Sequence, residues 1–446
     1  MQIAVIGGGI SGLTAAYQLR QSGASVTLFE AGPRLGGAIQ TVRQHGCLME
    51  AGPDSLLVMK PAAVQLAREL GLELVASVAE GPPGVVHKGR IQPLPDGFRM
   101  VAPTQLLPFV RTPLLSLGGK LRAGLEWLVP ATRASEDESV ADFVTRRFGR
   151  EVLDTLAQPL IGGIYAADPA RLSLLATLPM FRQLEQSKGS VTAGLLAQMK
   201  KSGSSKGSMF VTPREGMQSL VQALADRLED VRLSTPVEQL TPTATGWEVK
   251  ALGKTHPYRA VVLACAAPHL ARLTRFDPLL SDTLARIEST TTVTIHFLFD
   301  QQQIGAPLRG SGFVIPHVEG YHLTACTYSH LKYPGRAPEG KALLRCHIGN
   351  AMNQRAVLLE DQPLFELALE ELGPLLKLDG PPQQSMLVRH AQALPQYQVG
   401  HKELVAAIDR QLATHAGLAL AGNGLEGVGV SDCVTRARQA VEMVGA

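Results

Sequence analysis

The stretch that decides the fold reads QIAVIGGGISGLTAAYQLRQSGASVTLFE over residues 2–30. Its β-branched start predicts a buried strand, its middle a helix, and its end a second strand that finishes at Glu30. Between the first strand and the helix, Gly7, Gly9 and Gly12 satisfy the pattern G-x-G-x-x-G. Such glycines suit a tight turn, a close approach to a pyrophosphate and close packing of helix on strand. The stretch therefore predicts a βαβ unit that binds a dinucleotide at the helix N-terminus, with Glu30 on the ribose.

The residues after Glu30 indicate which dinucleotide is bound. They read Ala31-Gly32-Pro33-Arg34-Leu35-Gly36-Gly37. This run resembles the FAD-binding motif of the glutathione-reductase-like flavoproteins, especially of their amine oxidase and phytoene desaturase branch. An arginine can neutralise a pyrophosphate, and paired glycines let the backbone pass close to a cofactor. The motif therefore favours FAD over NAD.

The composition indicates a globular protein of the size of an enzyme. The chain has 446 residues, of which 45% are hydrophobic, 18% charged and 5% aromatic. This length accommodates two or three domains and excludes a stapled miniprotein. The five cysteines are scattered without a CxxC pair, so we predict no metal site and no disulfide framework, and a reducing compartment fits best. We see no signal peptide and no apolar run of roughly 18 residues, so we expect a cytoplasmic protein whose membrane contact could only be peripheral.

The motifs divide the chain into three interleaved parts of an α/β fold. We expect a Rossmann-like FAD-binding domain of the glutathione-reductase-like type from residues 1–75, 208–270 and 394–446. A sheet-based substrate domain takes residues 76–95 and 271–393, and a helical insertion takes residues 96–207. The insertion carries 14 basic and 10 acidic residues. This excess leaves two interpretations open, an ordinary solvated face or a patch that faces anionic lipid.

Two further segments supply candidate cofactor contacts. Residues 418–444 predict a buried strand, a glycine-rich loop and a last helix, whose free N–H groups would point at the flavin or its ribityl chain. Val237 lies in an expected strand whose backbone contacts the adenine in flavoproteins of this class. The alternative for Val237 is an ordinary core position.

The whole chain resembles the protoporphyrinogen oxidase family of haem biosynthesis, which includes bacterial coproporphyrinogen III oxidases of the oxygen-dependent FAD type. The resemblance rests on the glycine motif, on Gly52-Pro53-Asp54-Ser55, and on LPDGFR (94–99), PLIGGIYAADPARLSLLATLPMF (159–181), REGMQSLV (214–221), YPGRAPEG (333–340), QYQVGH (396–401) and GNGLEGVGVSDC (422–433). The segment at 162–166 and the closing GVGVSDC are specific to this family. Ala167 and Ser431 depart from its usual glycine and proline, which puts loop geometry in doubt.

The resemblance implies FAD-dependent oxidation of a porphyrinogen, protoporphyrinogen IX or coproporphyrinogen III, to the porphyrin. Three two-electron steps would use non-covalently bound FAD, with molecular oxygen as acceptor and hydrogen peroxide as product. No motif separates the two porphyrinogens, and we name no catalytic residue. The implied FAD contacts are Gly7, Gly9, Ile10, Ser11, Gly12, Glu30, Ala31, Arg34, Gly36, Gly37, Gly52, Pro53, Asp54, Ser55, Val237, Gly422, Gly427, Val428, Gly429 and Val430.

The shape and charge of the expected substrate suggest a second set of candidates, the substrate-binding residues. A porphyrinogen is a broad apolar ring with propionates, so its pocket should join apolar walls to one or two cations. Arg99, in LPDGFR, is the candidate for pairing a propionate through its forked guanidinium, with a solvent-facing role as the alternative. Gly163 and Ile164 are candidates for the pocket floor near the flavin, with a plain helix break as the alternative. Candidate pocket walls, for which core packing is the alternative, are Leu323, Tyr328 and Ile348.

Two other functions are weighed. An amine oxidase or carotenoid desaturase shares the fold, but amine oxidases place an aromatic cage and a lysine near the flavin, and aromatic residues are scarce here. A non-enzymatic protein like the Rab GDP-dissociation inhibitors would lack the pyrophosphate motif, which this chain keeps. As partners we expect a porphyrinogen and molecular oxygen, and no nucleic acid. A homodimer, contact with ferrochelatase and peripheral contact with the inner face of the cytoplasmic membrane stay open.

Overall fold

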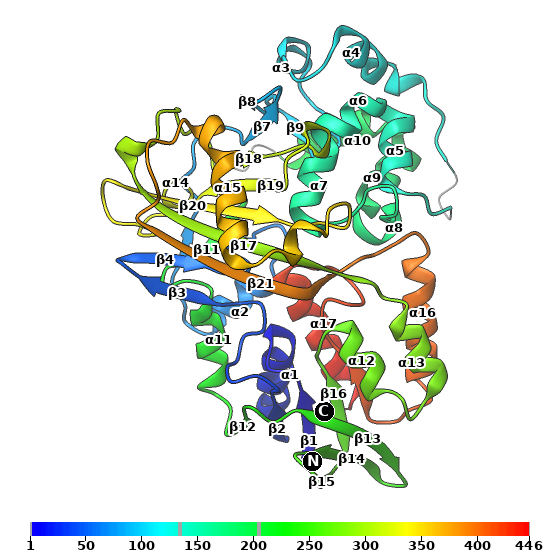
Figure 1. Ribbon diagram of the computed structural model, residues 1–446. Helices are drawn as coiled ribbons and strands as arrows, with labels where there is room; N and C mark the ends of the chain where they lie inside the picture. Colours follow the sequence, from blue (N-terminus) through cyan, green and yellow to red (C-terminus); the bar gives the residue numbers. More distant parts are fainter. Residues whose placement is uncertain (1, 133–135, 203–206, 446) are drawn as a thin grey trace.

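The computed structural model describes residues 2–132, 136–202 and 207–445. In Figure 1 a parallel sheet near both ends of the chain forms one end of the molecule, a largely antiparallel sheet lies beside it, and a group of helices forms the far end. The fold is therefore mixed α/β, with three layers of different character.

The first layer is a five-stranded sheet in which every neighbouring pair is parallel. Its central strand is β1 (Gln2–Ile6), which pairs with β2 (Ser25–Phe29) on one side and β16 (Ala260–Leu263) on the other. The outer strands are β12 (Asp230–Arg232) and β22 (Leu418–Leu420). Strands covered on both faces need continuous apolar runs, which is why the central strands read QIAVI and AVVL. The predicted βαβ unit is confirmed.

Helices and a meander cover the two faces of this sheet. The core on one face is shared with α1 (Ile10–Gln21), α2 (Ala62–Glu69), α11 (Gln218–Ala225) and α17 (Val430–Met443). The core on the other face is shared with the meander of β13 (Val237–Thr243), β14 (Gly246–Ala251) and β15 (Lys254–Tyr258), and with α12 (Ala267–Leu273), α13 (Pro278–Ala285) and α16 (His401–Leu412). Because α13 buries Leu280 and Leu284 in this core, the first layer extends past the boundary that we expected at residue 270.

The second layer is a seven-stranded sheet, antiparallel except where β18 meets β7. Its order is β21 (Gln384–Pro395), β17 (Ser289–Asp300), β20 (Lys341–Ile348), β19 (Leu323–Tyr328), β18 (Gly312–Val314), β7 (Gly84–His87) and β8 (Arg90–Pro93). The apolar residues of one face pack against α15 (Asp361–Leu376), as Figure 1 shows. The opposite face carries the charged and polar residues that meet the first layer.

Short elements join the two layers. They are the hairpin of β3 (Thr41–Gln44) with β4 (Cys47–Glu50), and a small sheet of β5 (Leu56–Leu57), β11 (Phe210–Pro213) and β6 (Leu74–Ala76). Cys47 and Met49 of β4 pack against Leu298 and Leu343 of the second sheet. The loop that follows β4 is thereby held between the layers.

The third layer is helical and follows the short hairpin of β9 (Phe98–Arg99) and β10 (Ala102–Pro103). Its elements are α3 (Leu106–Arg111), α4 (Leu117–Gly124), η1 (Leu125–Leu128), α5 (Val140–Phe148), α6 (Arg150–Val152), the π-helical turn η2 (Leu153–Ala157), α7 (Gln158–Tyr165), α8 (Leu174–Thr177), α9 (Pro179–Lys188) and α10 (Val191–Ser202). The stretch is therefore mainly helical, and its role as a separate insertion with the expected bounds stays a prediction. No helix within the ranges that the structure describes has the length and apolarity to cross a bilayer.

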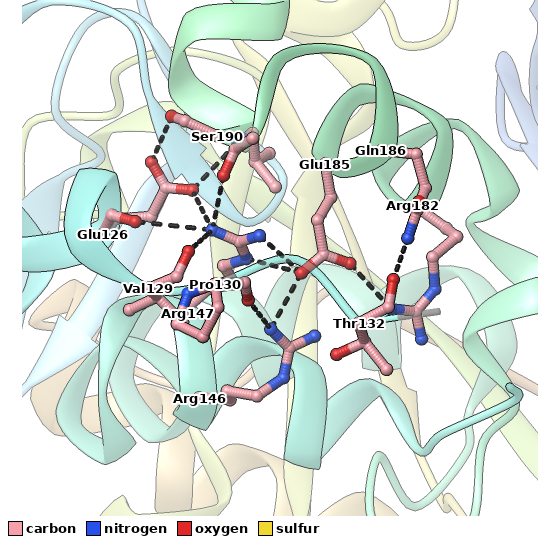
Figure 2. Close-up of polar contacts among 12 residues, drawn as sticks. Glu126, Val129, Pro130, Thr132, Arg146, Arg147, Arg182, Glu185, Gln186 and Ser190 are labelled. Atoms are coloured by element: carbon pink, nitrogen blue, oxygen red, sulfur yellow. Dashed lines mark hydrogen bonds and ion pairs between the residues drawn. The ribbon is translucent and has the colours of Figure 1, made fainter. Parts of the chain in front are cut away.

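A buried ionic network holds this third layer together (Figure 2). Arg147 is fully buried and pairs with Glu126 at 3.2 Å and with Glu185 at 2.5 Å, while it donates to the Val129 carbonyl at 2.9 Å. Burial alone would raise the pKa of Glu185, but Arg146 and Arg147 outweigh that effect and lower it. The network therefore ties η1 and the segment after it to α5 and α9.

Candidate active site

The glycine turn after β1 is closed so tightly that no side chain fits inside it. A Cβ added to Gly12 would lie 1.8 Å from the Gly7 carbonyl oxygen, and one added to Gly7 would lie 2.6 Å from the Ala264 oxygen. Gly7 also has a φ of +110°, a conformation that L side chains rarely adopt. The turn thus brings β1, β16 and the start of α1 close together.

The two charged residues of the nucleotide motif are held by backbone groups. Glu30 accepts hydrogen bonds from the Gly8 amide at 2.6 Å and from the Gly32 amide at 2.7 Å, so its carboxylate lies against the glycine turn. Arg34 donates to the Gly37 carbonyl at 2.7 Å and to the Ile39 carbonyl at 3.0 Å. The Arg34 guanidinium thus shapes its own loop, and its contact with the pyrophosphate stays a prediction.

The C-terminal segment of the chain places the N-terminus of a second helix, α17, beside that of α1. Gly9 begins α1 and Gly429 begins α17, and the two helices pack side by side in one core (Figure 1). The loop before α17 turns at Gly422 and Gly427, with φ of +111° and +70°. Free N–H groups at two neighbouring helix starts form a natural anion site. The remaining C-terminal candidates, Val428 and Val430, adjoin this loop and the start of α17.

The loop after β4 lies between the glycine turn and the second sheet. A Cβ on Gly52 would lie 1.8 Å from the Ala38 carbonyl oxygen, so this loop runs against the one that carries Gly36 and Gly37. Asp54 pairs with Lys332 at 2.8 Å and with Arg345 at 3.3 Å. Burial alone would raise the pKa of Asp54, but the two cations outweigh it and hold the pKa well below its ordinary range.

The face of the second sheet that meets this loop carries a row of basic side chains. Arg345 lies directly opposite His296 across the strand pair, and it donates to the Gly52 carbonyl. His347 follows on the same face of β20, and His390 donates to the Ala51 carbonyl at 2.8 Å. Burial, followed by the charge of Arg345, lowers the pKa of His296 to about 3. This face therefore presents fixed positive charge beside neutral imidazoles.

The described residues fit a flavin dinucleotide on three counts. A Cβ on Gly9 would meet nothing nearer than the Gly37 Cα at 4.0 Å, two helix starts offer free N–H groups, and Glu30 is held at the end of β2, where a ribose is expected. In addition, both ring nitrogens of His296 and Nε of Arg345 are buried and lack a hydrogen-bond partner within the described ranges. Val237 is buried and its carbonyl accepts from Arg272 at 3.1 Å, so its adenine contact stays a prediction.

The structure leaves three of the substrate candidates accessible. Arg99 is exposed on β9, and its side chain forms no hydrogen bond or ion pair with any residue that the structure describes. Gly163 and Ile164 are exposed near the end of α7, which packs against β18 and β19, and a Cβ on Gly163 would meet open space. These placements suit the expected roles, which remain predictions.

The other three substrate candidates are buried in the core. Leu323, Tyr328 and Ile348 have at most 2% of their surface exposed and pack in the cluster shared with α15. They lie on the sheet face opposite to Arg345, because side chains alternate between faces along a strand. Their burial favours the alternative of core packing over the expected pocket walls.

Sequence reasoning missed the basic row on the second sheet. The strands TTTVTIHFLFD and KALLRCHI contain His296, Arg345 and His347 at alternate positions among apolar residues. A polar residue at every second place in a buried strand indicates a face with partners. The sequence therefore contains a signal for His296, Arg345 and His347. No such pattern indicates a role for Lys332 on α14 (Ser329–Lys332).

Comparison with known proteins identifies the family. The family model described as flavin containing amine oxidoreductase matches residues 10–444. The chain belongs to this family. Coproporphyrinogen III oxidase of Bacillus subtilis (strain 168) is 35% identical over 98% of the chain and 97% of that protein. Protoporphyrinogen oxidase 2 of Arabidopsis thaliana is 27% identical over 99% and 93%.

Solved structures agree with this placement. A crystal structure assigned as a protoporphyrinogen oxidase from Exiguobacterium sp. 255-15 superimposes with a TM-score of 0.89, at 31% identity, over 99% of this chain and 98% of that one. Cyclohexylamine oxidase from Brevibacterium oxydans IH-35A superimposes with a TM-score of 0.73 at 17% identity, over 99% and 98%, which shows a shared fold alone. The chain thus lies in the porphyrinogen oxidase branch of the flavin-containing oxidoreductases.

Proposed function

We propose that this protein oxidises a porphyrinogen to the porphyrin in haem biosynthesis, with FAD as cofactor, molecular oxygen as acceptor and hydrogen peroxide as product. The observation that carries the proposal is a tight glycine turn beside two helix starts, in a chain that matches a coproporphyrinogen III oxidase over 98% of its length. Coproporphyrinogen III is the preferred substrate, because the relatives from Bacillus subtilis, Staphylococcus aureus and Propionibacterium freudenreichii, at 31% to 35% identity, are named as its oxidases.

FAD binding is assigned to a Rossmann-like domain of the glutathione-reductase-like type. The starts of α1 and α17 would hold the pyrophosphate, and Glu30 would hold the ribose. Binding would be non-covalent, since burial raises the pKa of the Cys433 thiol to about 11 and so disfavours the thiolate that a flavin thioether needs. When bound, FAD supplies the two-electron redox chemistry of the reaction.

The chain's own residues would bind and orient the macrocycle. Arg99 is free to pair with a propionate through its guanidinium, and Gly163 leaves room where a side chain would project. The basic row beside Asp54 would hold positive charge at the cofactor loop without supplying a proton, because the pKa values of His296 and His347 are lowered by burial.

An aerobic assay tests the proposal. Coproporphyrinogen III and protoporphyrinogen IX are offered separately, and porphyrin fluorescence is followed against the non-enzymatic rate. We expect a yellow protein with a flavin spectrum that oxidises coproporphyrinogen III faster. A colourless protein that cannot be reconstituted with FAD, or rates equal to the blank for both substrates, would contradict it.

A further inference from the structure

A net positive charge lies buried where the loop after β4 meets the second sheet. The Asp54 carboxylate on this loop pairs with Lys332 at 2.8 Å and with Arg345 at 3.3 Å, and the three side chains are only 8% to 18% exposed. Two cations against one anion leave a surplus of one positive charge. Water screens a charge in such a place much less than it screens one on the surface.

Neighbouring groups do not cancel this surplus. Burial, together with the charge of Arg345, lowers the pKa values of His296, His347 and His390, which therefore stay uncharged at neutral pH. Two other buried charged residues close to Asp54 have opposite signs, Arg336 and Glu50. Arg345 also keeps its Nε, and His296 both ring nitrogens, without a partner in the described part of the chain. Buried groups of this kind are costly, so stability alone does not explain the arrangement.

The loop after β4 links these residues to the expected cofactor site. Arg345 donates to the Gly52 carbonyl, and a Cβ on Gly52 would touch the loop that follows β2, at the Ala38 carbonyl oxygen. Farther along, Lys60 pairs at 2.7 Å with Asp432 in the first turn of α17. The segment from Gly52 to Lys60 thus connects the surroundings of the glycine turn with the start of α17, the two places that would hold the pyrophosphate.

The order of the strands indicates which half of the dinucleotide this loop would meet. Glu30, the expected ribose ligand of the adenosine half, follows β2, whereas α17 follows β22, and β1 and β16 lie between these strands. The redox half would therefore extend to the side of α17 and of the loop that carries Asp54.

We propose that Arg345 and Lys332, partly offset by Asp54, raise the reduction potential of the bound flavin. A reduced flavin holds more negative charge than an oxidised one, so a fixed positive charge beneath its loop favours the reduced state. The two cations act through their electric field and are not catalytic residues. This inference rests on the proposed function for its cofactor and adds what sets the redox balance of that cofactor.

The sign of the charge change separates an electrostatic role from a structural one. Arg345→Gln and Lys332→Gln each remove a positive charge, so each should lower the potential of the FAD-loaded protein. Asp54→Asn removes a negative charge and should raise it. Loss of the ion pairs alone would move the potential in the same direction in all three variants. Arg345→Lys keeps the charge and should stay close to the parent protein.

Two measurements on the FAD-loaded protein report the effect. The potential is measured by equilibration with a reference dye, and the affinity for sulfite by bleaching of the flavin absorbance. Sulfite donates an electron pair to the oxidised ring, which takes up the negative charge, so its affinity responds to the same field. We expect sulfite to bind about tenfold more weakly to Arg345→Gln and about tenfold more tightly to Asp54→Asn. A tenfold change in the stabilisation of the reduced state corresponds to about 30 mV for a two-electron couple.

Lys341→Gln is the matched control. Lys341 lies four residues from Arg345 on the same face of β20 and pairs with Asp300 at 2.7 Å, so the change removes a cation from an ion pair of the same strand. Its potential and sulfite affinity should equal those of the parent protein.

The outcomes distinguish this inference from the proposed function. Shifts of the same sign in Arg345→Gln and Asp54→Asn, no shift in either, or an equal shift in Lys341→Gln would overturn the inference. If the parent protein still oxidises a porphyrinogen, the proposed function survives that result. If Arg345→Gln does not fold, Lys332→Gln provides the same comparison with Asp54→Asn. A colourless protein that cannot be reconstituted with FAD would overturn the proposed function and this inference with it.

Discussion

Gly12 is the residue on which the cofactor turn depends most directly. Because an added Cβ would lie 1.8 Å from the Gly7 carbonyl, Gly12→Ala must push α1 away from β1. We expect the variant to lose most of its FAD and several degrees of thermal midpoint, as measured by flavin absorbance and by calorimetry. Gly124→Ala is the matched control, since a Cβ there meets open space, and it should keep both.

Arg99 permits a second test at the scale of one residue. Loss of a charge-assisted pair to a propionate should lower kcat/KM about 10- to 100-fold in Arg99→Ala, mostly through KM. The FAD content should not change, because Arg99 has no contact with the cofactor cradle. Arg90→Ala, another exposed arginine of the same segment, serves as control. Loss of FAD in Arg99→Ala would refute the assigned role.

At the scale of elements, the ion pairs of Asp54 with Lys332 and Arg345, which we call the clamp, couple the loop after β4 to β20 and α14. Asp54→Asn leaves Lys332 and Arg345 facing each other without an anion, which should cost about 3 kcal/mol of unfolding free energy. Removing one of these cations as well, in Asp54→Asn/Lys332→Met, should recover part of the loss. Urea unfolding of both variants and of Lys332→Met gives the coupling free energy between Asp54 and Lys332. If the changes in unfolding free energy of the two single variants add up to that of the double variant, the clamp has no energetic role.

Strands show why the sequence predicted the cofactor site better than the substrate site. The glycine turn and Glu30 follow from rules that act within thirty residues, and the structure places them as expected. Both faces of the second sheet are partly covered. The apolar character of a residue therefore does not indicate on which face its side chain lies. For Leu323 and Ile348 a pocket wall and core packing were both open, because a strand pattern fixes the alternation of side chains but not which face is which.

At the scale of the whole molecule, the buried histidines set the response of stability to acid. His296 has a pKa of about 3 when folded and about 6.5 when unfolded, so below pH 6.5 the unfolded chain binds the extra proton. Stability should therefore fall as the pH drops, by about 2 kcal/mol from this residue between pH 7 and 5. His296→Leu should flatten the dependence of the urea midpoint on pH over that range. A pH profile equal to that of the parent protein would contradict this prediction.

The interleaving of the layers could be predicted only in outline. Motifs near residues 10, 215 and 425 indicated one nucleotide domain made of separate segments, and the sheet order confirms that segments far apart in the chain pair there. The packing of α13 with that domain and the network around Arg147 depend on contacts between distant residues. No local pattern encodes such contacts, so they could not be predicted from the sequence.

The sheet order has a consequence for synthesis of the protein. The strand next to β16 is β22, and the helix start that completes the anion site belongs to α17, which ends at residue 443. A ribosome releases the glycine turn after β1 long before it releases α17, with about 400 residues in between. The nascent chain therefore cannot complete its cofactor site until α17 has emerged, and a product that stops before α17 lacks the second helix start.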